Sequence, residues 1–444
     1  MDVNRKWLIV ADDFEKPLAL TILIGLYIII CCVSLGYLPR FKYPGFFNAE
    51  AFHLFYDPTR LFAVTAIIAA FAVVSLLFSF ARFSFGYLVG FYLYTVILGY
   101  LWLNCFSDLN YNHRLTGLSA AASATAFLAP ALLITSPIKQ TWVLSEPAFD
   151  RLITFLSLVI AATIVIGGFY NFRFVAIKDI YDFRDKLGFP TPLRYSLGMT
   201  SGVLLPFVFT CFLERRNHWR AGAVLLVALL FYPITLSKLT LFTPAWLLFT
   251  AIFARIFGAR TTVVMSLLLP ILAGILFAAL KVWPAFFYIV NFRMIALPSN
   301  AMDIYNHYFS SHDPTYFCQI TILKVLVSCS FQSDLSVVMQ DTYHLGYFNA
   351  SLFATEGVAS VGPWFAPVTG FLCGLVFALG NRLSAGLSSR FILVSGAIIP
   401  QILLNVPLST VLLTHGLGLL FLLWYITPRG IFEPNAIERS GVDQ

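Results

Sequence analysis

Residues 17–38 read PLALTILIGLYIIICCVSLGYL, an apolar run that holds no charged side chain. An α-helix needs about 20 such residues to cross the hydrocarbon layer of a bilayer. Apolar runs of similar length recur along the whole chain, which predicts many helical spans rather than one. This first run exceeds the apolar core of a signal peptide and follows Asp12, Asp13 and Glu15. We therefore expect a retained first span and no cleaved leader.

The composition of the 444 residues points the same way. Hydrophobic residues make up 59% of the chain and charged residues 11%, with a mean hydropathy of +0.84. Water-soluble domains carry about 25% charged residues, and an outer-membrane barrel would alternate over segments of about ten residues. The predicted class is therefore all-α: a polytopic integral membrane protein with a single transmembrane domain, residues 1–444. The net charge of +7 is spread over short loops, which does not favour nucleic acid as a partner.

About twelve spans are predicted from the apolar runs. They are 17–38, 61–80, 83–104, 115–135, 149–170, 194–213, 219–236, 240–257, 261–282, 355–380, 390–406 and 408–427. Pro400 and Pro407 interrupt the last two, so these two also fit a broken pair.

The distribution of Lys and Arg sets the orientation, because short cytoplasmic loops carry an excess of both. With the N-terminus inside, the basic cytoplasmic turns are 214–220, 255–260 and 382–390. Two long loops then face outward: a basic loop, 171–193, and a large loop, 283–354. The shorter segment 39–60 faces the same side.

The basic loop opposes this charge rule, because its cations lie on the outer side. It contains Arg173, Lys178, Arg184 and Lys186 with Asp179, Asp182 and Asp185. An anionic ligand would explain the cations. The alternative is a solvated amphipathic helix on the membrane surface, held by i,i+4 ion pairs.

Two further cations lie at predicted outer helix ends. Arg293 follows the apolar stretch 286–292, where an arginine is costly unless it has a partner or reaches the interface. Lys238 lies at the tip of the hairpin between two spans. A guanidinium fork suits phosphate or pyrophosphate. Each residue fits either a phosphate contact or an ordinary interfacial anchor.

Candidates for proton transfer gather in the large loop. His307 and His312 have unperturbed pKa values near neutral pH, which suits a general base. His344 and Asp341 lie near the re-entry into the membrane. The alternative for each is a surface residue without a catalytic role.

Glu356 begins the span 355–380. A carboxylate at a helix N-terminus is favoured by the helix dipole, so a simple cap is one reading and the rim of a substrate cavity is the other. His53 and His113 lie in other outward loops, where they are candidates for neighbours of the large loop.

Cys318 and Cys329 fall in the large loop. They pair if the loop faces an oxidising compartment, and two free thiols are the alternative. No Cys/His set has the spacing of a zinc site, and no glycine-rich phosphate motif is present. We expect neither a metal nor another cofactor.

An ordered series of segments over most of residues 150–427 resembles the Wzy-type O-antigen polymerases of Gram-negative inner membranes. The series comprises Tyr181-Asp-Phe-Arg184-Asp-Lys-Leu, Arg215-Arg216-Asn217-His218-Trp219, the Lys238 hairpin, Arg293-Met-Ile-Ala-Leu-Pro298-Ser299, Tyr347-Phe-Asn349-Ala350 and Asn405-Val-Pro407-Leu. As in many polymerases of this type, Glu356 lies six residues before Gly362 at the entry to a glycine-rich helix. Val358 and Ser360 depart from the pattern, which often has an aromatic residue and an asparagine there.

The resemblance implies a membrane glycosyltransferase that needs neither a nucleotide sugar nor a metal. Such an enzyme takes a glycan from undecaprenyl pyrophosphate and joins it to a new lipid-linked repeat unit at the periplasmic face of the inner membrane. Lipid pyrophosphate is the leaving group. The implied partners are undecaprenyl-pyrophosphate-linked oligosaccharide as donor and acceptor, membrane lipid, and a chain-length regulator protein.

Arg184 and Arg293 are then expected to be catalytic, because cations aimed at the departing oxygen stabilise the transition state more than the ground state. Arg173 and Lys238 are expected to support them in binding the pyrophosphate.

The acceptor hydroxyl must lose a proton as it attacks. His307 or Glu356 is expected to take it, and the sequence does not decide between them. The expected substrate contacts are Tyr181, Tyr305, His312, His344 and Asn349.

Two rival functions remain open at this point. The distantly related O-antigen ligases share the architecture and chemistry but transfer glycan to lipid A-core. A lipid-linked oligosaccharide flippase or other transporter belongs to a different class. Transporters typically show two similar halves and polar residues at mid-membrane, whereas this chain concentrates its polar residues in two outward loops.

Overall fold

A computed structural model describes residues 15–40, 50–176, 179–184, 187–320, 323, 328–346 and 352–432. In this part of the chain, helices account for all regular structure apart from one isolated bridge between Leu54 and Ser107. Ten helical stretches are long and apolar enough to cross a membrane, and a bent pair makes an eleventh. The prediction of an all-helical, multi-pass chain is confirmed at this level.

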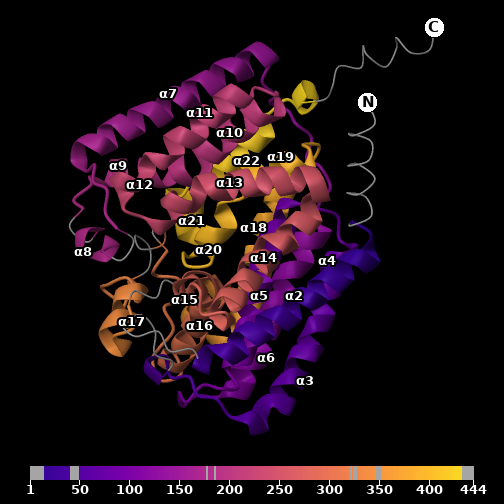
Figure 1. The fold of residues 1–444 in the computed structure, drawn as a ribbon, viewed down its shortest axis with the longest axis vertical. Helices are drawn as coiled ribbons and strands as arrows, with labels where there is room; N and C mark the ends of the chain where they lie inside the picture. The colour runs from indigo at the N-terminus through magenta and orange to yellow at the C-terminus, as the bar shows by residue number, and fades with distance from the viewer. Residues whose placement is uncertain are drawn as a thin grey trace. The chain divides into compact units, whose positions relative to one another are not determined.

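The ten stretches carry the labels of Figure 1. They are α2 (Pro17–Tyr37), α3 (Leu61–Ala72) continued by α4 (Leu76–Phe80), α5 (Phe85–Leu103), α6 (His113–Leu133), α7 (Glu146–Tyr170), α9 (Thr191–Met199) continued by α10 (Leu205–Glu214), α11 (His218–Leu229) with α12 (Phe231–Thr235), α13 (Lys238–Phe257), α14 (Ala259–Ala279), and the π-helical η8 (Phe353–Val358) continued by α18 (Ala359–Ser384). The bent pair is α21 (Leu408–Thr414) and α22 (Leu417–Ile426), at 59° to each other.

Side-chain caps explain where several helices begin. Ser84 accepts from the backbone N–H of Tyr87 at the start of α5, and Asn112 accepts from that of Leu115 at the start of α6. Asn217 does the same for α11. Each oxygen satisfies a backbone donor that has no partner within its helix, which stabilises the helix start by about 1 kcal/mol.

The predicted span 390–406 differs from the structure. It forms two short helices, α19 (Ser389–Gly396) and α20 (Ile399–Leu403). Pro400 lacks a backbone N–H and is tolerated only near a helix start, so the chain begins a new helix there. The sharp bend instead lies between α21 and α22, where Gly416 has a φ of +81°.

The chain divides into two compact units. The first unit comprises Met1–Thr135, Ile252–Asn381 and Pro400–Val411, and the second comprises Ser136–Ala251, Arg382–Ile399 and Leu412–Gln444.

In the first unit, α5 forms the centre. All of its residues are buried, and it packs against α2, α6, α14 and α16 (Figure 1). A Cβ on Gly86 would lie 2.1 Å from the carbonyl oxygen of Ala131, so only glycine permits α5 and α6 to approach this closely. The side chain of Asn381 bridges α5 and α6 at the same place: it accepts from Gly86 N at 2.6 Å and donates to Ala131 O at 2.7 Å.

The large loop of the sequence prediction contains a continuous helical segment. It runs through α15 (Pro284–Phe287), the π-helical η6 (Tyr288–Ala296) and α16 (Leu297–Tyr308). Asn291 donates to Ser34 Oγ and to Ile271 O, both at 2.9 Å. This segment therefore packs against the bundle of the first unit. A further helix, α17 (Leu335–Tyr343), follows it.

In the second unit, the basic loop lies against the turn between α12 and α13. Arg173 N donates to Pro233 O at 3.0 Å, and the Tyr232 hydroxyl donates to Val175 O. The loop carries a short helix, α8 (Ile180–Arg184), whose Ile180 packs in a small core with Leu236.

Candidate functional site

Five polar side chains of the first unit meet at the end of α16. We call Ser107, Tyr111, Asp303, His307 and Tyr343 the Asp303 cluster. Asp303 is completely buried, and its carboxylate accepts hydrogen bonds from Ser107 Oγ at 2.7 Å and from the Tyr111 hydroxyl. His307 lies four residues further along α16, on the same helix face. A buried carboxylate and an imidazole thus lie one helical turn apart.

The turn between α5 and α6 positions two members of this cluster. The bridge to Leu54 holds Ser107. His113 is held at both ring nitrogens, with Nδ1 2.7 Å from Asn104 Oδ1 and Nε2 2.8 Å from Leu109 O. Tyr111 lies 4.1 Å from His113 between ring centroids. These contacts fix the shape of the turn.

Burial dominates the protonation of Asp303. It raises the pKa of this carboxyl to about 6, against the opposing effects of hydrogen bonds from Tyr111 and Ser107 and of nearby His113 and His53. His53 itself pairs with Asp108 at 3.0 Å. A carboxyl with a pKa close to neutral exchanges its proton under physiological conditions, as catalytic and switching groups do.

His307 is half-buried beside the buried carboxylate. Its Nδ1 lies 2.5 Å from the Tyr343 hydroxyl, and its ring centroid lies 6.5 Å from that of Tyr111. Burial lowers the pKa of His307, with smaller contributions from His53 and His312. The imidazole is therefore neutral at pH 7 and able to accept a proton.

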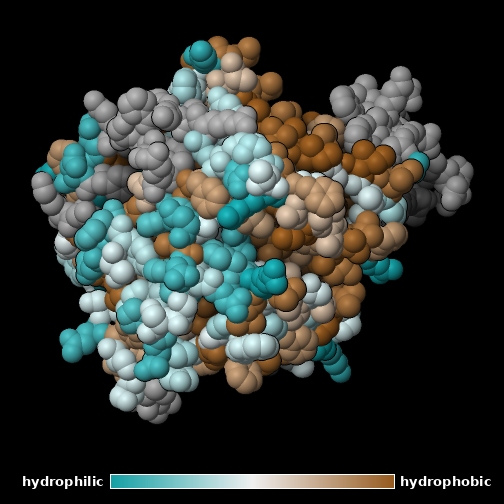
Figure 2. All heavy atoms as spheres, turned by 90° about the horizontal axis from the view of Figure 1, so that it is seen from below, coloured by the Kyte–Doolittle hydropathy of each residue, from teal (hydrophilic) through white to brown (hydrophobic). Residues whose placement is uncertain are grey.

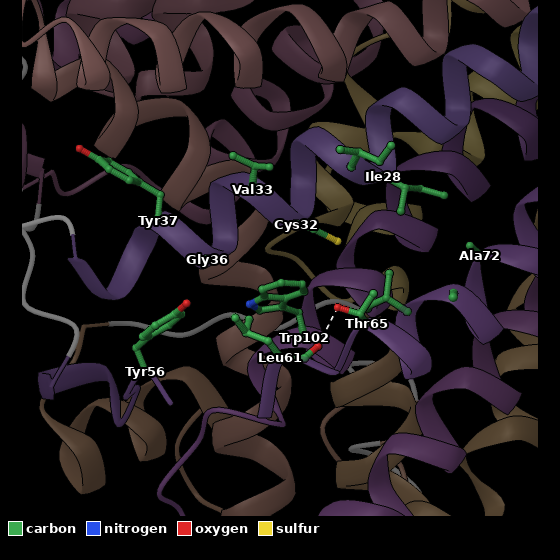
Figure 3. A pocket seen from close by; sticks show the side chains of 13 residues that line it. Ile28, Cys32, Val33, Gly36, Tyr37, Tyr56, Leu61, Thr65, Ala72 and Trp102 are labelled. Carbon is green, nitrogen blue, oxygen red and sulfur yellow. Dashed lines mark hydrogen bonds between the residues drawn. The ribbon is translucent and has the colours of Figure 1, made fainter. Parts of the chain in front are cut away.

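An apolar cavity of about 550 Å³ lies between α2, α3 and α5 of the same unit. In Figure 3 the rings of Tyr37 and Tyr56 lie at one end, Ile28 and Ala72 lie at the other, and Trp102 lies between them.

The aromatic end of this cavity adjoins the Asp303 cluster. Phe106 packs against Tyr56 at 6.0 Å and against Trp102 at 5.9 Å between ring centroids. The next residue is Ser107, which binds Asp303. Two adjacent residues, Phe106 and Ser107, thus contact the cavity lining and the buried carboxylate respectively.

Arg60 places a cation at this end of the cavity, next to the lining residue Leu61. Its Nη1 donates to Cys105 O at 2.9 Å, its Nε lies 3.5 Å from Asp57 Oδ2, and its guanidinium lies over the Phe55 ring at 4.7 Å. The side chain remains about half exposed. Figure 2 views the molecule from below and shows hydrophilic side chains beside apolar surface on the face in view.

Arg293 lies in the π-helical η6, in the first unit. Its guanidinium lies over the Tyr288 ring at 5.5 Å, and Nη2 donates to the Tyr288 hydroxyl at 3.5 Å. Fourteen residues of continuous helix separate Arg293 from His307, which corresponds to roughly 20 Å along the axis. The two residues therefore lie well apart along one helical segment.

Glu356 is buried in η8, and its carboxylate binds other parts of the chain. Oε2 accepts from the Thr355 hydroxyl at 2.6 Å. Oε1 accepts from Ser409 N at 3.0 Å and Ser409 Oγ at 3.2 Å, at the start of α21. This is a capping arrangement, formed with a helix other than the one that carries Glu356.

The expected substrate contacts have different environments. Tyr305 is buried. His312 is exposed and stacks on Tyr308 with 3.9 Å between ring centroids. His344 is exposed at the end of α17 with a φ of 56°. The side chain of Tyr181 and the whole of Asn349 lie outside the described residues.

The remaining expected cations belong to the second unit. Arg173 and Arg184 are exposed, and Lys238 is half-buried at the start of α13. The hydrogen bond from Arg173 N to Pro233 O brings the basic loop beside the turn that leads to Lys238. Convergence of these three cations with Arg293 stays a prediction.

Cys318 and Cys329 form a disulfide, with Cα atoms 5.1 Å apart. The sequence left pairing and free thiols open, and the structure shows pairing. Disulfides persist in oxidising compartments, which agrees with an outward position for the large loop.

Sequence reasoning missed Asp303, Ser107, Tyr111, Tyr343 and Arg60. One signal was available: Asp303 is a carboxylate between the apolar residues Met302 and Ile304, four residues before a histidine. Nothing in the sequence pairs it with the turn before α6. Across the described residues, no group of three or more His, Cys, Asp or Glu side chains is arranged to hold a metal ion.

No family model, no curated protein and no solved structure matches this chain.

Proposed function

We propose that the chain is a membrane glycosyltransferase of the Wzy type, which polymerises undecaprenyl-pyrophosphate-linked repeat units into O-antigen at the periplasmic face of the inner membrane. One observation carries the proposal. Within the first unit, the cavity-lining residues Tyr56 and Trp102 pack on Phe106, and the next residue, Ser107, binds the buried carboxylate of Asp303, one helical turn before a neutral histidine. A lipid-linked sugar needs this combination, with an apolar groove for the polyprenyl chain and acid–base groups beside its polar head.

His307 takes the role of general base in this proposal. The acceptor hydroxyl attacks the anomeric carbon of the donor glycan, and its proton passes to the imidazole. The bond from that carbon to the phosphate oxygen breaks, and its electron pair leaves with the lipid pyrophosphate. Tyr343 positions the imidazole through Nδ1. Among the described residues, Nε2 has no hydrogen-bond partner, which leaves it for the hydroxyl.

His307 is preferred over Glu356 on the contacts of each group. Both oxygens of Glu356 bind Thr355 or Ser409, so it would have to break structural hydrogen bonds before accepting a proton. Breaking such bonds in a buried site costs about 1–3 kcal/mol each.

Arg293 is proposed to bind the pyrophosphate, with Arg184, Arg173 and Lys238 in support. Negative charge grows on the departing oxygen, and a fixed guanidinium stabilises it without reorganisation. Because the attacking hydroxyl and the departing oxygen flank one anomeric carbon, this role requires the side chains of Arg293 and His307 to approach one another across the roughly 20 Å of helix between them.

Reconstitution tests the proposal. The purified chain in liposomes is supplied with lipid-linked repeat units and no lipid A-core, and a gel resolves the products. A ladder of lengthened lipid-linked glycan supports a polymerase. Glycan appearing only after lipid A-core is added would indicate a ligase, and movement across the bilayer without lengthening would indicate a flippase.

The matched variants are His307→Gln and His218→Gln. Both remove one histidine, but His218 is an exposed residue at the start of α11 in the second unit. Loss of a general base lowers rates by about 10²–10⁴-fold. Equal activity of the two variants would contradict the role of His307.

A further inference from the structure

A second cavity lies in the second unit, between α7, α10 and α11. It has a volume of about 710 Å³, and its walls are mostly aliphatic. The wall includes Ile153, Ala161, Val165, Leu205, Val208 and Val227. No step of the proposed reaction uses this cavity.

One end of the cavity is charged. Arg215, Arg220 and Asp150 line it there, and Arg215 Nη1 lies 2.5 Å from Asp150 Oδ1. Two guanidinium groups against one carboxylate leave a net positive charge. Arg220 is exposed, lies over the Phe212 ring at 5.7 Å, and is in no ion pair among the described residues. This cation is therefore available to an external anion.

The length of the apolar wall indicates that the bound anion carries a long hydrocarbon chain. Ile153 and Val165 line the cavity twelve residues apart on α7, which corresponds to ~18 Å along the helix. One leaflet of hydrocarbon is about 15 Å deep, half of the full layer. Free phosphate would need only the charged end, whereas a phospholipid occupies both parts.

We propose that this cavity binds an anionic phospholipid, with its phosphate on Arg220 and Arg215 and one acyl chain along α7. Basic pockets between membrane helices on the cytoplasmic side recognise anionic headgroups in this way. The site is independent of the glycan chemistry proposed for the first unit. Trp219, which is 82% exposed in the same turn, fits the aromatic belt at a membrane interface.

Photo-crosslinking tests the site. The purified full chain in nanodiscs is supplied with phosphatidylglycerol or phosphatidylcholine that carry the same photoreactive acyl chain. Phosphatidylglycerol is expected to label peptides from 150–165 and 205–230, and phosphatidylcholine much less. Equal labelling by both lipids, or labelling only elsewhere, would overturn the proposal.

Matched variants separate this site from general surface charge. Arg220→Gln is expected to weaken phosphatidylglycerol labelling about fivefold. Arg151→Gln removes an exposed cation of α7 that does not line the cavity, and labelling should be retained. Equal loss in both variants would show a nonspecific surface effect and refute the site.

Two further measurements cover the acyl chain and the headgroup. Ala161→Phe fills the apolar wall and is expected to reduce labelling, with gel filtration confirming that the variant remains folded. Inorganic phosphate should fail to raise the melting temperature as phosphatidylglycerol does. Equal stabilisation by phosphate would identify a free-anion site and refute the lipid assignment.

Discussion

Asp303 shows how one residue changes character on burial. In the chain it is an acidic residue between Met302 and Ile304, and in the fold it is a fully buried acceptor of two hydroxyl hydrogen bonds. Ser107 and Tyr111 satisfy its oxygens but do not replace the lost hydration. The pKa therefore rises to about 6 despite these two hydrogen bonds.

Asp303→Asn should change how stability depends on pH. The folded carboxyl holds its proton up to about pH 6, and the unfolded one releases it near 3.8. The stabilisation from this proton is fully present below pH 3.8 and is lost as pH rises through 6. The difference corresponds to roughly 3 kcal/mol. Melting temperatures in detergent from pH 4 to 7.5 should therefore fall more steeply for the wild type than for Asp303→Asn, and parallel curves would contradict the assignment.

Arg293 is the cation proposed to bind the pyrophosphate of the leaving group. Arg293→Ala should reduce chain lengthening by about 10²–10³-fold, because a fixed cation at the leaving group is lost. Arg293→Lys should retain part of the activity, since it keeps a point charge without the planar fork. The measurement is the glycan ladder of the reconstituted variants at equal membrane protein.

Arg114→Ala is the matched control for Arg293. Arg114 is exposed in the first turn of α6 and lies outside the Asp303 cluster. Its loss should leave the ladder intact. A normal ladder from Arg293→Ala would refute the pyrophosphate role.

Among the elements, α16 depends on a close approach to α5. A Cβ on Gly99 would lie 2.3 Å from Ser299 Oγ and 3.2 Å from Ile295 Cγ2. Ser299 Oγ in turn donates to Val96 O at 2.9 Å. The register of α16 on α5, and with it the position of Asp303, thus follows from a glycine far away in sequence.

Gly99→Ala should destabilise the protein by about 1–3 kcal/mol, because overpacking forces α16 away from α5. Gly25→Ala on α2 is the control, since nothing lies within 4 Å of its Cβ position. The control should be neutral or slightly stabilising. Thermal unfolding in detergent checks both. Adding Ser299→Ala to Gly99→Ala should restore part of the loss, and a purely additive double variant would argue against this contact.

The helix ends agree with the predicted spans where the apolar runs are long and uninterrupted. α2, α7 and α14 begin and end within a few residues of the predicted spans 17–38, 149–170 and 261–282. The helix from Pro284 to Tyr308 was read as loop, because it mixes aromatic, polar and apolar residues. Its buried polar groups are satisfied by distant partners, as in the bonds from Asn291 to Ser34 and Ile271. A hydropathy pattern cannot reveal such hydrogen bonds between residues that are distant in sequence.

In the whole molecule, contacts in the second unit indicate on which side of the membrane the last helix, α22, ends. Arg429, just past α22, donates to Leu383 O at 2.6 Å, and Ile138 N donates to Arg382 O at 3.3 Å. The end of α22 therefore lies at the same face as the end of α18.

Reporter fusions test this topology. Fluorescent protein fused after Thr427 should fluoresce, and alkaline phosphatase there should be inactive, because the basic turn 382–390 is expected to be cytoplasmic. Phosphatase fused after Ser310, at the end of α16, should be active. An active phosphatase after Thr427 would reverse the predicted side of this face.

The sequence by itself determined the class of this protein, since membrane spans depend on the local content of apolar residues. It also located the histidines and arginines that carry the proposed chemistry. Only the tertiary structure decided which of them meet. Asp303 lies 196 residues from Ser107 and 192 from Tyr111 along the chain. These residues come together because glycines and buried polar contacts hold α16 against α5, and such long-range contacts leave no periodic signal in a single sequence.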